Sequence, residues 1–411
     1  GWRRQRQADV SQLDLDTLLE HDYIEEVPAG EEPLGSCTVF TVDELVKGRR
    51  RLIIEPWLND VLVFPGTTRL PELAEVISRV TFECAATADF TAFYNQFRLP
   101  LGSRNWYTFR FNTKLYRTKN VCTGQRQTPA LAQALTASIA AAAASEAGAA
   151  ADAYIDNVRF SGTPQEAAQA MACFTRTARE IGITINGCEA DLRPTTSYTF
   201  LGVHFRHDES AVRLGEKTVH KLATHAAALP HILTLRQALQ MTGVLVWAYR
   251  VLAQPLGQLY YLFKFMRRRA SRYIGEPADM WPSLLPLLTD KLVHLQGISR
   301  VVGESPTHNH YDVYSDACLS GFGAVVFAPD GGVTIHAGAF TRAEHINVLE
   351  MRALCSATKL VPDGASATFY VDNTSALFVA RKTTSRNFIL SKLAVRMSAD
   401  LAARNITAQF V

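Results

Sequence analysis

Short apolar runs and amphipathic stretches alternate along the first half of the chain. Up to about residue 208, runs typical of strands, such as TFECAATADF, alternate with helical patterns such as residues 166–181. The alanine-rich stretch from Pro129 to Ala151 predicts one long helix, because alanine has the highest intrinsic helix propensity. AYIDNVRF predicts two strands around a tight turn, and SYTFLGVHF predicts a strand.

The pattern changes twice in the second half. From Lys217 to about Gly303, amphipathic spacing predicts helices throughout. The polar, proline-containing GESPTHNH that follows is typical of a linker. Beyond it, strand, glycine-containing hairpin, strand, helix, strand and helix patterns predict a mixed α/β domain. We therefore predict an α+β protein with domains at residues 1–208, 209–305 and 309–411.

Composition and charge narrow the class of protein. The 411 residues, 47% hydrophobic and 20% charged, are enough for two or three globular domains. The net charge is only +3, but arginines cluster at residues 3–6, 49–51 and 267–272, which favours local contacts with phosphates. Seven scattered cysteines without a CxxC pair indicate an intracellular protein, nuclear or cytoplasmic rather than secreted. No apolar run has membrane-spanning length, so no membrane partner is expected.

Two aspartates at the ends of predicted strands form the first candidate site. Asp89 closes one strand, and Asp156 lies in the turn of the predicted strand pair. Carboxylates held side by side repel each other unless a cation lies between them. Mg²⁺ prefers such oxygen ligands, and two ions could clamp the attacking and leaving oxygens of a phosphoryl transfer. An isolated aspartate at a strand end is more often a turn or cap residue. The residues around Asp89 and Asp156 therefore have to distinguish a metal ligand from a turn residue.

The neighbouring residues form several recognisable motifs. DFTAFYNQF, beginning at Asp89, and TGQRQTPALAQ, residues 123–133, are similar to the first and second palm motifs of retroelement reverse transcriptases. YIDN, residues 154–157, resembles the Tyr-x-Asp-Asp box, and FLG, residues 200–202, resembles the hairpin that grips the primer. Upstream, LVKGRRRLIIEPWLN matches the fingers segment. The implied fold is a right-hand polymerase with fingers, palm and thumb.

The resemblance implies a role for each matching residue. Asp89 and Asp156 become catalytic metal ligands for Mg²⁺ or Mn²⁺, two ions per active site. Tyr94 becomes the steric gate whose ring excludes a 2′-hydroxyl, although it could also be an ordinary core aromatic. The remaining matches are implied to bind substrate: Lys47, Arg50, Gln133, Asn157 and Gly202.

Three positions depart from the family pattern. Asn157 stands where a second Asp is usual, and Thr123 stands where Phe or Gln is more frequent. Glu189 lies near the place of a lysine thought to protonate the leaving pyrophosphate. Asn157 removes one negative charge from the site, and Glu189 in place of lysine removes a proton donor. These changes bear on polymerase activity and leave the predicted fold unaffected.

Three more acids follow the linker in a second pattern. Asp316 lies in a predicted strand, Glu350 on a helix beside its buried face, and Asp372 at the end of another strand. This order resembles ribonuclease H, whose acids hold two magnesium ions over an RNA–DNA hybrid. HINVLE, residues 345–350, is similar to retrotransposons that use a tyrosine recombinase, the DIRS and VIPER-like group. The family's fourth acid would lie beyond Val411, so we expect this domain to be truncated at its C-terminus.

Together the motifs favour a retrotransposon RNA-directed DNA polymerase with a linked ribonuclease H, both using two-metal phosphoryl transfer. The expected partners are an RNA template, a DNA primer, RNA–DNA hybrid and deoxynucleoside triphosphates; the oligomeric state stays open. The alternative is a catalytically degenerate or host-adopted copy that binds nucleic acid or acts as a scaffold. An unrelated metal-dependent nuclease in the first region would leave Tyr94 and residues 123–133 unexplained.

Overall fold

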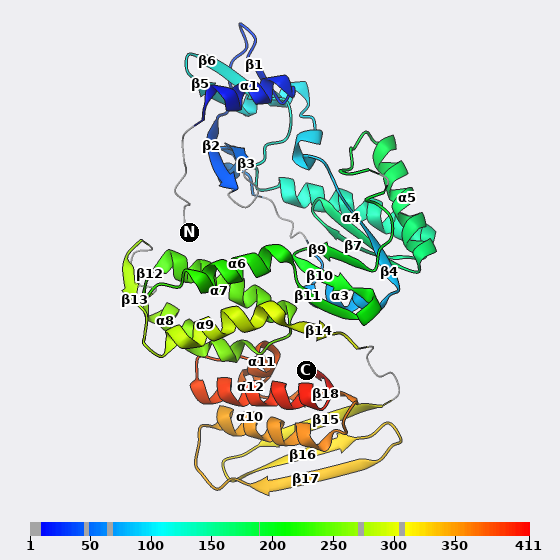
Figure 1. Cartoon of the computed structure of the whole chain (residues 1–411), viewed down its shortest axis with the longest axis vertical. Helices are drawn as coiled ribbons and strands as arrows, with labels where there is room; N and C mark the ends of the chain where they lie inside the picture. Colours follow the sequence, from blue (N-terminus) through cyan, green and yellow to red (C-terminus); the bar gives the residue numbers. More distant parts are fainter. Residues whose placement is uncertain (1–9, 45–48, 64–68, 189, 270–274, 304–308) are drawn as a thin grey trace. The chain divides into compact units, whose positions relative to one another are not determined.

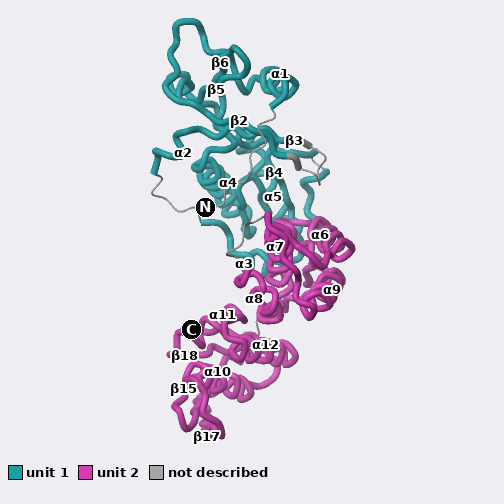
Figure 2. The backbone as a smooth tube through the Cα atoms, turned by 90° about the vertical axis from the view of Figure 1, so that its left-hand side faces the viewer, with its two compact units in different colours: residues 1–196 teal, residues 197–411 magenta. Residues whose placement is uncertain are grey.

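The computed structural model describes residues 10–44, 49–63, 69–188, 190–269, 275–303 and 309–411. The chain divides into two compact units, Gly1–Thr196 and Ser197–Val411 (Figure 2). The predicted division at residues 208 and 305 stays a prediction. Within the described residues, no helix is long and apolar enough to cross a membrane.

The first unit contains three small antiparallel sheets and five helices among its described residues. The sheets have the strand orders β1-β6-β5, β2-β3 and β4-β8-β7. In chain order the elements are α1 (Gln12–Glu20), β1 (Ile24–Glu26), β2 (Cys37–Glu44), β3 (Arg49–Pro56), α2 (Leu58–Val61), α3 (Leu73–Ser78), β4 (Cys84–Asp89), β5 (Thr108–Phe111), β6 (Lys114–Thr118), α4 (Thr128–Ala147), β7 (Ala150–Tyr154), β8 (Asn157–Gly162) and α5 (Pro164–Glu180).

Helices α4 and α5 pack on the β4-β8-β7 sheet and form the main core of this unit. The buried alanines of α4 have small side chains, which let the helix pack closely on the sheet. The predicted helix of residues 129–151 ends earlier than expected, because Gly148 takes a left-handed φ of +72° and terminates α4. Ala150 and Ala151 then belong to β7, so pairing with β8 outweighs their helix propensity.

A buried ion pair crosses the β7–β8 hairpin. Asp152 faces Arg159 in the register, and their side chains are 1% and 0% exposed. Arg159 Nε donates to Asp152 Oδ2 at 3.0 Å, and Arg79 Nε donates to Asp152 Oδ1 at 3.0 Å. Arg159 Nη2 also donates to the Val76 carbonyl at 2.6 Å, which ties α3 to the sheet. Sequence analysis did not identify this cluster.

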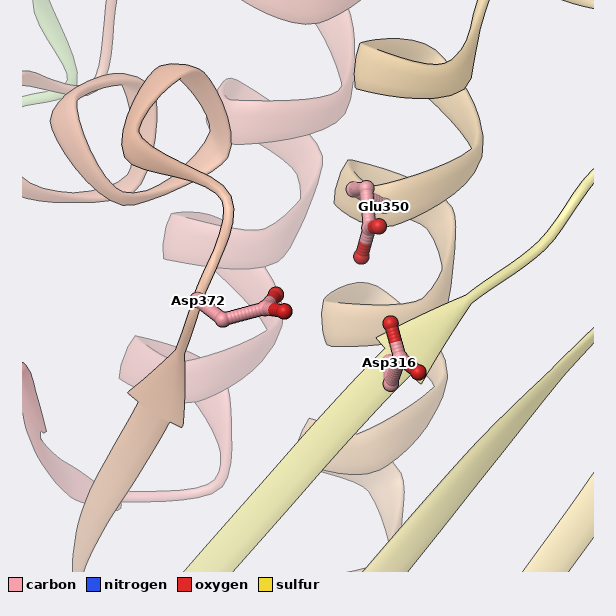
Figure 3. A group of neighbouring side chains, drawn as sticks. All are labelled: Asp316, Glu350 and Asp372. Carbon is pink, nitrogen blue, oxygen red and sulfur yellow. The ribbon is translucent and has the colours of Figure 1, made fainter.

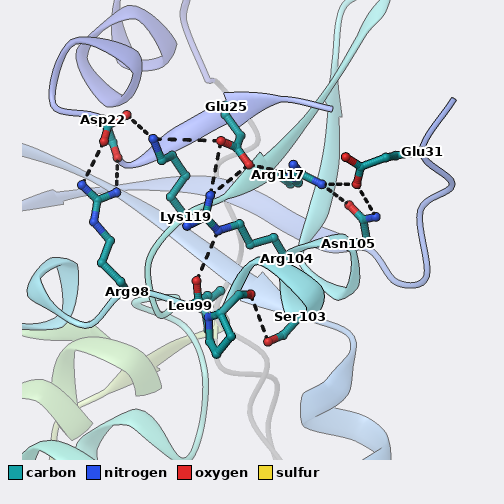
Figure 4. Close-up of polar contacts among 11 residues, drawn as sticks. Asp22, Glu25, Glu31, Arg98, Leu99, Ser103, Arg104, Asn105, Arg117 and Lys119 are labelled. Atoms are coloured by element: carbon teal, nitrogen blue, oxygen red, sulfur yellow. Dashed lines mark hydrogen bonds and ion pairs between the residues drawn. The ribbon is translucent and has the colours of Figure 1, made fainter. Parts of the chain in front are cut away.

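A second polar network joins the α1–β1 segment to the β5–β6 hairpin (Figure 4). The buried Arg117 donates to Glu25 at 2.7 Å and to Asn105 at 2.7 Å, and also pairs with Glu31. Arg98 holds Asp22 at 2.9 Å. These bonds connect residues far apart in sequence and fix α1 and β1 to the same small sheet.

The second unit combines a helical part with a larger sheet. Its sheets have the orders β14-β11-β10-β9, β12-β13 and β17-β16-β15-β18-β19. The elements are β9 (Ser197–Phe200), β10 (Val203–Arg206), β11 (Ala211–Leu214), α6 (Glu216–Ala227), β12 (Ile232–Thr234), α7 (Leu235–Val251), α8 (Tyr260–Arg269), β13 (Pro277–Asp279), α9 (Leu284–His294), β14 (Ser299–Val301), β15 (His310–Ala317), β16 (Gly321–Phe327), β17 (Val333–Ala339), α10 (Ile346–Ala357), β18 (Ser366–Val371), α11 (Thr374–Lys382), α12 (Phe388–Ala403) and β19 (Thr407–Phe410).

Two predictions for the start of this unit were wrong in detail. SYTFLGVHF is a hairpin of β9 and β10 rather than one strand, because Leu201 and Gly202 both take a left-handed φ and reverse the chain. The stretch predicted as helical throughout, residues 217–303, also contains β12, β13 and β14. Strands of three residues are too short to produce a recognisable periodicity.

The five-stranded sheet is covered by helices on one face. Val313 and Val326 point into the core with α10, α11 and α12, which lie beside the sheet in Figure 1. On the opposite face, Tyr314 is 46% and Ile335 75% exposed. β15 runs parallel to β18 and antiparallel to β16, so the mixed α/β prediction is confirmed. Strand β17 was not predicted separately.

Candidate active sites

The sheet pairing of the first unit brings Asp89 and Asp156 to the same place. Asp89 is the last residue of β4 and pairs in register with Asn157, the neighbour of Asp156. The Phe90 N–H donates to the Asp156 carbonyl at 3.0 Å. Both aspartates line one cavity of about 800 Å³. Residues far apart in sequence therefore face a common space.

Other elements complete the walls of this cavity. The wall residues come from α1, from β3, from the segment after β4 and from two loops: Leu13, Asp14, Thr17, Leu18, Arg50, Arg51, Leu52, Ile53, Phe90, Thr91, Ala92, Phe93, Tyr94, Asn95, Thr123 and Asn186. Burial raises the pKa of the Tyr94 phenol, and the charge of Asp156 raises it further, against the opposing charge of Arg51. Tyr94 therefore lines the same cavity as Asp89 and Asp156, and its role as the steric gate stays a prediction.

Amide groups hold the two carboxylates without neutralising them. Asn157 Nδ2 donates to Asp156 Oδ1 at 2.7 Å, and Asn186 Nδ2 lies 3.4 Å from Asp89 Oδ2. Neither aspartate forms an ion pair with the residues that the structure describes. Two carboxylates without a counter-cation are a donor set that suits Mg²⁺ or Mn²⁺.

The turn that presents Asp156 is held in a strained conformation. Ile155, a β-branched residue, has a left-handed φ of +58°, which such residues rarely adopt. The buried Gln133 of α4 accepts from the Ile155 N–H at 2.6 Å and donates to the Ala153 carbonyl at 3.0 Å. The Thr136 hydroxyl donates to the Ile155 carbonyl at 2.5 Å. Helix α4 therefore fixes this turn from behind.

Gln133 was predicted to bind substrate; in the structure its amide nitrogen and oxygen each bond to this turn, and it is absent from the cavity wall. For the polymerase activity that the sequence resemblance implies, we expect Gln133→Leu to lower kcat for primer extension by about 10- to 100-fold, as loss of a supporting contact typically does, with little change in KM for nucleotides. The unpaired Ile155 N–H should also cost about 1–3 kcal/mol of stability, measured as a lower Tm.

Gln169→Leu, on the exposed face of α5, is the matched control for that substitution. A selective rise in KM with normal kcat would instead support the substrate-binding role and contradict the positioning role.

The structure places the remaining predicted residues as follows. Arg50 lines the cavity and its Nη2 lies 3.4 Å from Asp14 Oδ2. Lys47 and Glu189 lie outside the described residues. Gly202, in the second unit, has a φ of +78° in the β9–β10 turn, and its carbonyl accepts from the Gly215 N–H at 2.9 Å. Its predicted contact with the primer stays a prediction.

The second site lies where the carboxyl ends of two inner strands of the five-stranded sheet meet (Figure 3). Asp316 is near the end of β15, and Asp372 directly follows β18. Because these neighbouring strands are parallel, with Ser315 opposite Val371, their carboxyl ends meet at the same edge. Glu350 reaches the pair from α10, whose Leu349 and Ala353 are buried beside it.

Oxygen atoms of the three acids lie within 4.8 Å of one another. Asp316 and Asp372 are exposed, whereas Glu350 is only 6% exposed. Burial raises the pKa of Glu350 to about 7, and the charges of Asp316 and Asp372 contribute to this rise. Such crowding is unfavourable without a cation, so the donor set fits a divalent metal that prefers oxygen ligands.

Neighbouring polar groups hold Asp316 and the chain segment that follows Asp372. The Ala317 N–H donates to Asp316 Oδ1 at 2.8 Å. Asn373 Oδ1 caps α11 by accepting from the Ala376 N–H at 2.9 Å, and Asn373 Nδ2 donates to Asn347 Oδ1 of α10 at 3.2 Å. The residue after Asp372 therefore connects the strand end to both helices. Sequence analysis missed both asparagines. The only signal of Asn347 was its place at the start of a helix, and that of Asn373 was its place as a helix cap.

Comparison with solved structures agrees with this architecture. The whole chain matches the foamy viral protease-reverse transcriptase dRH bound to double-stranded DNA, with a TM-score of 0.60, 14% identity and 71% of that chain covered. It also matches the foamy viral protease-reverse transcriptase in complex with double-stranded DNA, with a TM-score of 0.59, 14% identity and 85% of that chain covered. The match to the foamy viral protease-reverse transcriptase in complex with RNA/DNA hybrid has a TM-score of 0.58, 15% identity and 55% of that chain covered.

Sequence comparison adds no closer relationship. No protein-family model matches the chain. No curated protein matches it either. At 14–15% identity the structural likeness concerns the fold alone. The chain has a reverse transcriptase/ribonuclease H-like fold.

Proposed function

We propose that this protein is an RNA-directed DNA polymerase with a linked ribonuclease H that degrades the RNA of RNA–DNA hybrids. The observation that carries the proposal is the convergence of two acid sets, Asp89 with Asp156 around one cavity and Asp316, Glu350 and Asp372 within 4.8 Å. Two such sites on one chain match the two successive reactions of reverse transcription.

In the polymerase site, Asp89 and Asp156 would hold the catalytic ions. Bound Mg²⁺ or Mn²⁺, two ions per site, would stabilise charge on the attacking and leaving oxygens of the phosphoryl transfer. Arg50, a cavity wall residue, and Lys47 would bind the triphosphate through their positive charges. Tyr94 would lie beneath the sugar and leave no volume for a 2′-hydroxyl.

In the ribonuclease H site, Asp316, Glu350 and Asp372 would hold the ions over the scissile phosphate. The buried Glu350, with its pKa raised to about 7, would bind a proton near neutral pH when no cation is present and release it on metal binding. Metal affinity should therefore rise with pH. Asp316 and Asp372 provide the exposed oxygens on which an extended substrate could approach.

The finer assignments follow the sequence resemblance. Residues 1–208 would form fingers and palm, 209–305 the thumb and helical connection, and 309–411 the ribonuclease H domain. The partners of the whole protein would be an RNA template, a DNA primer, RNA–DNA hybrid and deoxynucleoside triphosphates. The HINVLE segment favours a retrotransposon of the DIRS and VIPER-like group, acting inside the cell.

A second candidate function is nucleic-acid binding without catalysis. Asn157 favours it, because it contributes an amide to Asp156 where the family usually has a further carboxylate. A degenerate or host-adopted copy would retain the fold and its basic surfaces while losing turnover. Retention of the other acids, Asp89, Asp156, Asp316, Glu350 and Asp372, favours the active enzyme.

Primer extension on an RNA template separates the two functions. We expect the full chain to extend a DNA primer with Mg²⁺ or Mn²⁺, and Asp89→Asn to reduce extension by about 10³-fold, because metal-held charge contributes several kcal/mol to the barrier. Glu180→Gln, an exposed charge at the end of α5, is the matched control. Hybrid binding without any extension would support the second function, and extension unaffected by Asp89→Asn would indicate a contaminating polymerase.

A further inference from the structure

Helix α1 supplies a wall of the cavity that holds Asp89 and Asp156. Leu13, Asp14 and Thr17 of this helix face the cavity. Leu15, next to Asp14, is buried in a core cluster with Ile24 of β1 and Ile54 of β3. A packed helix rather than a loop therefore presents Asp14 to the cavity. The sequence motifs assign no role to this residue.

The carboxylate of Asp14 is held in place by the start of its own helix. Ser11 donates to Asp14 Oδ2 from its N–H at 2.8 Å and from its hydroxyl at 2.7 Å, and the Asp14 N–H donates back to the hydroxyl at 3.2 Å. This capping box fixes the N-terminus of α1. Burial raises the pKa of Asp14, but the Ser11 hydrogen bonds and the Arg50 charge outweigh it, so the pKa lies below its ordinary value.

Arg50 approaches the oxygen that Ser11 already holds. Its Nη2 lies 3.4 Å from Asp14 Oδ2, and its side chain remains 40% exposed. A guanidinium has five N–H donors in a planar fork, so one long contact leaves most of them available to a second anion. An untethered arginine side chain would lose considerable rotamer freedom on binding a ligand.

We propose that Asp14 is a positioning residue that holds Arg50 against the cavity, ready to bind the triphosphate of the incoming nucleotide. This inference rests on the proposed polymerase function. Asp14 lowers the entropic cost of ordering Arg50 and leaves the reacting atoms untouched. Its effect should therefore appear in nucleotide binding and not in the chemical step.

The test is Asp14→Asn, which keeps an oxygen for the cap and removes the charge. We expect KM for deoxynucleotides to rise about three- to tenfold, the range for ordering one long side chain, while kcat and KM for the template–primer stay unchanged. In an Arg50→Ala background the same substitution should add no further rise in KM. Asp16→Asn is the matched control, since it removes the same charge from α1 outside the cavity wall.

Each other outcome has a defined meaning. An unchanged KM in Asp14→Asn would overturn the proposal, and a lower KM would show that Asp14 competes with the triphosphate. A rise that persists without Arg50 would mean that Asp14 acts through another group. If the wild-type chain binds a fluorescent deoxynucleotide without extending the primer, weaker binding by Asp14→Asn supports the inference while the polymerase function fails. Absence of nucleotide binding by the wild type refutes both.

Discussion

Glu350→Gln is expected to lower hybrid cleavage by about 10³-fold, because it removes a carboxylate from a site where metal-held charge contributes several kcal/mol to the barrier. Glu350 is the buried member of the triad, so no water can substitute freely for its oxygens. The measurement is the single-turnover rate on an RNA–DNA hybrid. Glu344→Gln is the control, because Glu344 lies just before α10, outside the acid triad, where Arg352 donates to it at 3.0 Å.

The same substitution should change how stability depends on pH. Because the folded-state pKa of Glu350 is raised from 4.5 to about 7, the folded protein keeps a proton that the unfolded chain releases in this range. The metal-free wild type should therefore lose stability as the pH rises from about 4.5 to about 7. Glu350→Gln should weaken this loss, and Mg²⁺ should raise the wild-type Tm more at pH 8 than at pH 6. Equal metal-free pH profiles for both proteins would contradict the assignment.

Asp152→Asn should destabilise the first unit by about 3–5 kcal/mol, the usual cost of removing one partner from a buried ion pair. The substitution leaves Arg159, which is 0% exposed, without its counter-charge. It also removes one of the two oxygens that accept from Arg159 and Arg79, because Asn keeps a single side-chain oxygen. For a unit of this size the expected fall in Tm is roughly 6–20 °C. Thermal unfolding followed by circular dichroism would measure it.

An exposed partner of the same cluster provides the control. Glu75 pairs with Arg79 at 3.2 Å, and its side chain is 55% exposed. Glu75→Gln should change stability by at most about 1 kcal/mol, because solvent screens surface ion pairs. A Tm for Asp152→Asn equal to that of Glu75→Gln would show that the buried pair contributes no more than a surface pair.

Position relative to strand ends made the acids predictable. Asp89 closes a predicted strand, Asp372 ends another and Asp316 lies within a third, and Asp156 lies between two runs that form a hairpin. The helix carrying Glu350 was recognisable from its buried face. The hairpin at Leu201 and Gly202 was indicated only by the resemblance of residues 200–202 to the primer-gripping hairpin. The strand pattern missed it, because a two-residue reversal hardly interrupts the apolar pattern.

The structural roles of several other residues could not be recognised from the neighbouring sequence. Asp152 and Arg159 look like ordinary polar residues in sequence, and only the register of β7 and β8 sets them opposite each other in the core. Gln133 resembled a substrate contact, yet it hydrogen bonds to the turn around Ile155. Asp14 belongs to a segment with no resemblance that could assign it a role.

The sequence by itself determined which segments are strands and helices around the acids, and in what order the two acid sets occur, because periodicity and turn residues act over a few neighbouring positions. The tertiary structure alone decided which charges become neighbours and how strongly they interact. Sheet pairing brings Asp316 beside Asp372, and burial of Glu350 against them shifts its pKa, since distance and solvent exclusion, rather than residue type, set electrostatic energy.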